Sequence, residues 1–141
     1  MKKLRAAVLV AVASMTGAVL SATPATAAPS PASICGSGYG VIDSAASTYV
    51  RLYLLYSRTS GKNCAVAIHL GSAYGPSHKI SIVGIENKSG RIDTDGGPGS
   101  LYSKYAGPVY VSGKGQCVRA WAALEYKGAS RRASIPWGHC S

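Results

Sequence analysis

Three histidines and five carboxylates are the side chains of this 141-residue chain that could support acid–base or nucleophilic chemistry. A serine hydrolase needs its nucleophile on a tight turn such as G-x-S-x-G, and the sequence contains no such motif. His69 alternates with apolar residues along a predicted strand, and we expect it to be a surface or edge residue. A glycosidase needs two carboxyl groups roughly 5 to 10 Å apart, for which Glu86 and Glu125 on predicted strands are the candidate pair. Neither pattern is complete, and we predict no catalytic residues.

Metal and cofactor motifs are equally incomplete. The segment DTDG at 93–96 resembles the beginning of a calcium loop, but the bidentate glutamate that ends such a loop is missing. We interpret it as a turn stabilised by aspartate side chains. The glycines at 36–40 have G-x-G spacing without the preceding strand and following helix that a phosphate-binding loop requires. The sequence therefore predicts no metal site and no cofactor.

The four cysteines lack the close C-x-x-C pairing of zinc ligands. An even number of cysteines in a short exported chain indicates two disulfides. Three pairings are possible, and we favour Cys35–Cys64 and Cys117–Cys140 because they join near neighbours. Each bond would stabilise the fold by about 3 kcal/mol, chiefly by restricting the unfolded chain.

Aromatic residues are more informative, since the chain has nine tyrosines, two tryptophans and no phenylalanine. Tyrosine and tryptophan combine an apolar ring with a polar tip, which suits carbohydrate stacking and protein interfaces. Five aromatic and cationic residues fall on strand faces opposite the more aliphatic ones. These surface-binding candidates are Tyr49, Arg51, Tyr53, Arg119 and Trp121. They form an exposed binding surface if those faces point outward, and a second layer of core if the sandwich is closed there.

The first 27 residues have the pattern of a secretory signal peptide: a basic start, an apolar run at 6–20 and small residues at 25–27. Removing its three basic residues lowers the formal net charge from +10 to +7. The remaining cations are scattered, which favours weak contact with anionic polymers, such as cell-wall polysaccharide, over specific nucleic-acid binding. No later stretch is apolar enough to span a membrane. We expect a flexible tail at 28–34 and one β domain at 35–141.

Alternating apolar residues predict the strands of that domain. Within the stretch 105–126, strands at 109–111 and 117–126 are expected to form a β-hairpin around a turn at 112–115. Segments 48–57 and 64–70 are expected to form a second hairpin. Further strands are expected at 41–44, at 79–86 with a bulge at Gly84, and at the edge segment 129–137. The segment 87–99 is expected to be a long turn that includes a short strand at 91–93. No helix of ten or more residues is expected. These elements predict an all-β fold, a small antiparallel sandwich or barrel.

Several blocks carry a resemblance to a known family. They are CGSGYGVIDS at 35–44, TSGKNCAV at 59–66, YAGPVYVSGKGQCV at 105–118 followed by Trp121, and HC at 139–140. With these blocks the chain resembles the spore-associated protein A family of spore-forming actinobacteria. The resemblance implies a small exported protein associated with spores or aerial growth. It implies no catalytic residues.

We therefore expect a non-enzymatic secreted protein that associates with the spore or cell surface through tyrosine, tryptophan and basic residues. The alternative is a secreted inhibitor or protein-binding module that presents the segment 87–99 or 131–137 to another secreted protein. A small hydrolase is the least favoured function.

Overall fold

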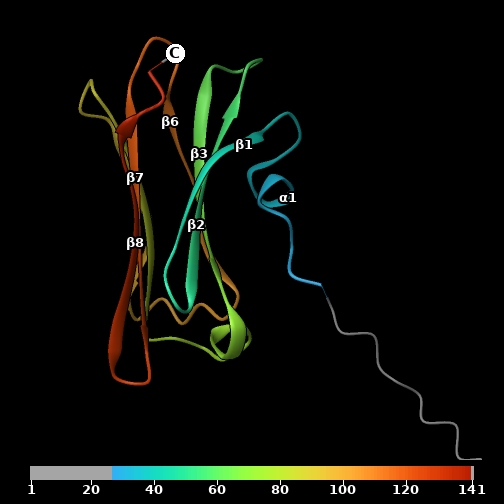
Figure 1. Ribbon diagram of the computed structural model, residues 1–141, viewed down its shortest axis with the longest axis vertical. Helices are drawn as coiled ribbons and strands as arrows, with labels where there is room; N and C mark the ends of the chain where they lie inside the picture. The colour runs from blue at the N-terminus through green and yellow to red at the C-terminus, as the bar shows by residue number, and fades with distance from the viewer. Residues whose placement is uncertain (1–26, 141) are drawn as a thin grey trace, which may run out of the picture.

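The computed structural model describes residues 27–140 as two four-stranded antiparallel sheets packed face to face (Figure 1). Sheet A has the order β1-β2-β3-β6, and sheet B has the order β5-β4-β7-β8. The strands are β1 Gly40–Ala46, β2 Val50–Ser57, β3 Lys62–His69, β4 Ile80–Asn87, β5 Ile92–Pro98, β6 Tyr105–Ser112, β7 Val118–Tyr126 and β8 Ala129–Gly138. The predicted all-β fold is confirmed, and of the two predicted architectures it is the sandwich rather than the barrel. The predicted signal peptide lies almost wholly outside the described residues.

The core lies between the sheets and follows the period of two in the strands. In β2, Val50, Leu52 and Leu54 are fully buried and face the other sheet. Val83 in β4 and Leu124 in β7 meet them from sheet B. The central strands β2 and β3 form the hairpin predicted from the sequence, in regular register from Val50 opposite His69 to Ser57 opposite Lys62.

The hairpin predicted around the turn at 112–115 is wrong, because β6 and β7 belong to different sheets. Strand β6 pairs with β3, whereas β7 lies between β4 and β8. The connection between β6 and β7 is held by Gly61 in the turn before β3, whose carbonyl accepts hydrogen bonds from Gly113 N–H and Lys114 N–H at 2.9 and 3.0 Å. This segment therefore crosses from one sheet to the other. Alternation identifies a strand and its buried face, but it does not identify the neighbouring strand.

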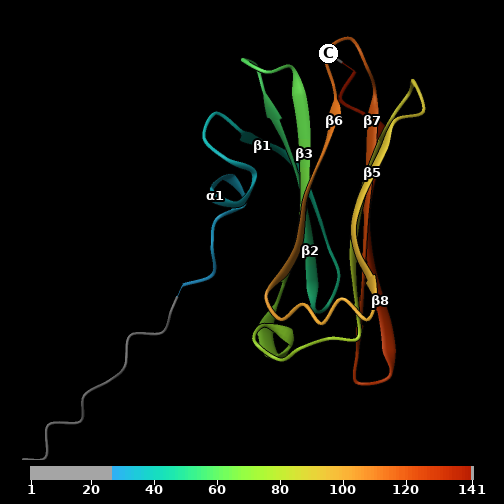
Figure 2. The same ribbon diagram turned by 180° about the vertical axis from the view of Figure 1, so that it is seen from behind.

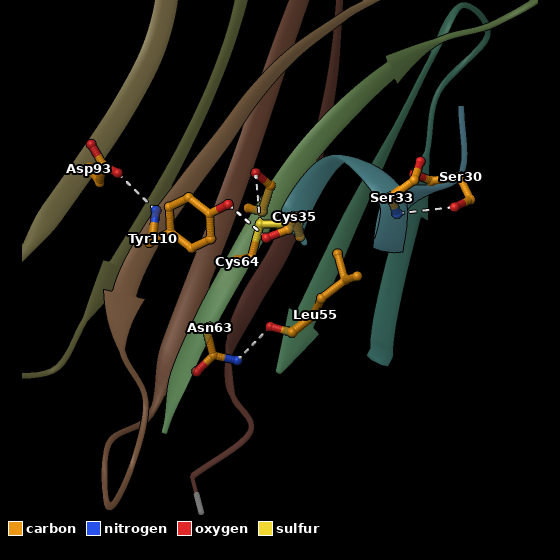
Figure 3. The surroundings of a disulfide bond; sticks show 9 residues. Ser30, Ser33, Cys35, Leu55, Asn63, Cys64, Asp93 and Tyr110 are labelled. Atoms are coloured by element: carbon orange, nitrogen blue, oxygen red, sulfur yellow. Dashed lines mark hydrogen bonds between the residues drawn. A yellow bond between two sulfur atoms is a disulfide. The ribbon is translucent and has the colours of Figure 1, made fainter. Parts of the chain in front are cut away.

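Two shorter segments also differ from expectation. The segment 92–98, expected to be mostly turn, is the edge strand β5. The tail at 28–34 contains most of the short helix α1, Pro31–Cys35, which is capped by the Ser30 hydroxyl oxygen 3.1 Å from Ser33 N–H (Figure 3). Helix α1 lies on the outer face of sheet A, on the side away from sheet B (Figures 1 and 2).

Both predicted disulfides are confirmed. The Cys35–Cys64 bond attaches α1 to the outer face of β3, where Tyr110 OH donates a 2.8 Å hydrogen bond to the Cys35 carbonyl (Figure 3). The Cys117–Cys140 bond joins the residue before β7 to the chain after β8. Each bond therefore fixes a terminal segment of the domain to a central strand.

Two aspartates close the side of the sandwich where the edge strands β5 and β6 lie next to each other. Asp95 accepts hydrogen bonds from Tyr102 OH at 2.8 Å and from Gly107 N–H at 2.7 Å. Asp93 accepts one from Tyr110 N–H at 2.8 Å (Figure 3). The interpretation of these aspartates as turn residues is therefore wrong. They lie on a strand, and their carboxylates bind backbone groups on the free edge of the opposite sheet.

Candidate surface-binding site

The five surface-binding candidates lie in three separate places. Arg119 and Trp121 are on the outer face of sheet B, and Arg51 and Tyr53 are on the outer face of sheet A. Tyr49 lies at one end of the sandwich, where its ring contacts that of Tyr126 at a centroid distance of 4.9 Å. A single surface made of all five residues is therefore not formed. The pair on sheet B borders a groove.

This groove has a volume of about 460 Å³ and lies along β7 and β8, between two tryptophan side chains. Its lining residues are Arg119, Ala120, Trp121, Ser134, Ile135, Pro136 and Trp137. We call it the tryptophan groove. Reasoning from the sequence did not select Trp137 as a binding residue, although it falls at the end of the predicted edge strand.

A β-bulge creates the groove. Val118 pairs with Gly138 and Ala120 with Ile135, so that Arg119 alone lies opposite both Pro136 and Trp137. Proline has no N–H to donate to the ladder, and it is therefore tolerated at a bulge in the edge strand β8. The extra residue changes the direction of the strand and leaves Trp137 36% exposed.

Gly84 in β4 makes room for the other wall of the groove. It pairs with Trp121 in regular register, and the predicted bulge at Gly84 is therefore wrong. A β-carbon on Gly84 would lie 2.2 Å from Cε2 of Trp121, a distance at which atoms clash. The indole thus occupies the space that a side chain at position 84 would fill. Glycine at this position allows Trp121 to lie across the neighbouring strand.

Two cations lie near the Trp137 ring. Lys88 Nζ is 4.1 Å from the ring centroid, and Arg119 Cζ is 4.9 Å from it and 5.9 Å from that of Trp121. These are cation–π distances. Arg119 also donates a hydrogen bond from Nε to Glu86 Oε2 at 2.6 Å, so its charge is paired. The tryptophan groove therefore combines exposed aromatic surface with positive charge.

The carboxylates do not form a hydrolytic pair. Glu86 lies opposite Arg119 in the register, and Glu125 is six residues further along β7. At about 3.3 Å per residue the two carboxyl groups are roughly 20 Å apart, beyond the range of a glycosidase. Among the residues that the structure describes, no group of three histidine, cysteine or acidic side chains is placed to hold a metal ion.

His69 is buried, which corrects the expectation of a surface or edge residue. It is 1% exposed, because β3 is a central strand and its last residue points into the sandwich. Its Nε2 lies 2.8 Å from Ser81 Oγ, and its ring packs edge-on against His78 at 4.8 Å. Burial lowers the pKa of His69 from 6.5 to about 4, although a hydrogen bond with the Ser103 backbone opposes this effect.

The contact between His69 and Ser81 resembles part of a hydrolase triad but lacks the features needed for catalysis. Both side chains are 1% exposed, so a substrate cannot reach the hydroxyl. No hydrogen bond joins a carboxylate to the imidazole within the described part of the chain. This serine–histidine contact is a link between the two sheets.

The segments expected to form inhibitory loops belong largely to regular strands. Most of the segment 87–99 is β5, paired with β4, and the segment 131–137 lies within β8, paired with β7. The exposed turn at 88–91 is the main part of these two segments that lies outside a strand. No helix in residues 27–140 has the length and apolar character needed to cross a membrane.

Comparison with known proteins identifies one relative. Over 112 residues the chain is 37% identical to spore-associated protein A of Streptomyces coelicolor, an alignment that covers 78% of this chain and 68% of that protein. No protein-family model matches the sequence. No solved structure matches it either.

Proposed function

Since this chain belongs to the spore-associated protein A family, we propose that it is a secreted, non-enzymatic protein that associates with the spore or cell surface. The tryptophan groove is its binding site, and a surface polysaccharide is its ligand. The resemblance found in the sequence and the similarity to the Streptomyces protein both support a role at the spore. The two disulfides fit a protein that works in an oxidising extracellular space.

One observation carries the choice of ligand: two partly exposed indoles border an open groove on an otherwise regular sheet. Indole rings offer a broad apolar surface with a polar N–H at its edge, which matches the apolar face and hydroxyl rim of a sugar ring. The groove is an open depression on β7 and the edge strand β8 rather than an enclosed cavity, so a long polymer can reach it without being threaded.

Co-sedimentation with purified spores and with purified cell walls tests this proposal. Trp121→Ala should lower the apparent affinity about ten-fold, the loss expected when roughly 1.4 kcal/mol of stacking is removed. Val41→Ala is the matched control, because it truncates an exposed apolar side chain on β1 in the other sheet. If the Trp121 variant binds as strongly as the wild-type protein, the tryptophan groove is not the binding site.

A further inference from the structure

Resting on the proposed function, we infer that the tryptophan groove selects polysaccharides bearing carboxylate or phosphodiester groups, and that Lys88 is the residue that recognises the anion. Trp121 provides the stacking surface for a sugar ring. Trp137 holds Lys88 beside that surface. Glu86 forms an ion pair with Arg119, so the positive charge of Arg119 is neutralised and does not attract the ligand.

Lys88 is fixed in position by its backbone. It lies in the turn between β4 and β5, and its N–H donates a 3.0 Å hydrogen bond to the carbonyl of Cys117. That cysteine immediately precedes β7 and forms the second disulfide, so the turn is attached to a covalently anchored part of sheet B. The side chain then reaches Trp137, with Nζ 4.1 Å from the ring centroid. A lysine held at both its backbone and its ammonium group loses little further freedom when it binds an anion.

The charges around the groove are unbalanced. The Glu86 carboxylate is 15% exposed and already bound to Arg119, so it is not available to Lys88. Among the described residues, no carboxylate lies within ion-pair distance of Lys88. Lys88 and Arg119 both approach the Trp137 indole. With these two positive charges and the single negative charge of Glu86, the groove has a net charge of +1. An anionic group on the ligand would balance that charge.

Lys127 provides a matched control for Lys88. It lies in the turn between β7 and β8, at the other end of β7 from Arg119, and its Nζ is 5.2 Å from the ring centroid of Tyr126. Lys127→Gln therefore removes the same charge and the same kind of contact from sheet B, away from the groove. Any difference between Lys88→Gln and Lys127→Gln then reports the position of the charge rather than its loss.

The test measures affinity for three purified polysaccharides: a neutral glucan, a polygalacturonate and a phosphomannan whose sugars are joined by phosphodiester groups. Lys88→Gln should weaken binding to a charged polymer about five-fold or more and leave glucan binding unchanged. Glu86→Gln should strengthen binding to the same polymer about three-fold, because it unmasks Arg119. Lys127→Gln should change neither by more than two-fold. The charged polymer that responds identifies the anion as carboxylate or phosphodiester.

The outcomes separate this inference from the proposed function. If Trp121→Ala weakens binding but Lys88→Gln behaves like Lys127→Gln, the inference is overturned and the binding site stands. If wild-type protein binds the glucan as tightly as both charged polymers, the inference is also overturned. If Trp121→Ala binds spores and cell walls as strongly as the wild-type protein, the tryptophan groove is not the binding site and the inference fails with it. If the wild-type protein binds spores but none of the three polymers, the inference alone is overturned. Thermal unfolding of each variant shows whether a lost affinity reflects a lost fold.

Discussion

Replacing Asp95 by alanine removes the acceptor that joins β5 to β6 across the side of the sandwich. The variant loses the hydrogen bonds from Tyr102 OH and from Gly107 N–H, at 2.8 and 2.7 Å. Because β5 and β6 are edge strands of different sheets, no β-ladder replaces these bonds. The hydrogen bond to Asp95 also raises the pKa of Tyr102, because it stabilises the neutral phenol.

The expected loss follows from two hydrogen bonds to a charged group. Each contributes about 1.5–3 kcal/mol, and the lower values apply because the site is only partly buried. We expect Asp95→Ala to lower the free energy of unfolding by about 3 kcal/mol. Asp95→Asn keeps one carbonyl acceptor for Gly107 and should lose about half as much.

Urea unfolding with both disulfides intact measures these differences. Glu125→Ala is the control, since it removes one negative charge from an exposed position with no ion pair in the described structure. The reasoning is refuted if Asp95→Ala and Glu125→Ala differ by less than about 0.5 kcal/mol, the usual range for surface substitutions.

Three further predictions concern the tryptophan groove and the core. Gly84→Ala should push the Trp121 indole out of its place over β4. We expect the tryptophan fluorescence emission to shift to the red and the affinity for polymer to fall as it does in Trp121→Ala. An unchanged emission spectrum would contradict this prediction. His69 should make the fold less stable in acid: its folded pKa is about 4 and its unfolded pKa about 6.5, so only the unfolded chain binds the proton between these values. The free energy of unfolding should therefore fall by on the order of 1–3 kcal/mol as the pH drops from about 6.5 to 4, and then level off. Urea titrations at pH 7 and 4.5 measure this fall, which should be absent in His69→Gln. Replacing Cys117 and Cys140 together by alanine should lower the free energy of unfolding by about 3 kcal/mol and weaken polymer binding. Removing the Cys35–Cys64 disulfide should cost similar stability but leave polymer binding intact. Equal losses of binding in the two variants would argue against the location of the site.

Local patterns predicted the strands and the disulfides well. Alternation in β2 identifies Val50, Leu52 and Leu54 as one buried face, and the polar turn after β2 signals the hairpin with β3. The pairing of near-neighbour cysteines was also correct. These features depend on residues close together in the sequence, where the geometry of a strand or turn limits the possibilities.

Contacts between distant segments could not be predicted in the same way. Lys88 and Trp137 meet because β4 and β8 lie on either side of β7, and nothing in either segment specifies that order. His69 was misplaced for a related reason, since its burial depends on β3 being a central strand that faces Ser81 on the other sheet. Helix α1 has only five residues, too few for a helical period to show in the sequence.

The position of α1 has a practical consequence for orientation. The helix is attached to the outer face of sheet A, while the tryptophan groove opens on the outer face of sheet B, so the chain at residues 27–30 leaves the domain on the side opposite the groove (Figures 1 and 2). A label or fused domain joined upstream of α1 would project away from a bound polymer. When many copies coat a polysaccharide layer, their amino-terminal sides would all face outward and form the new exterior.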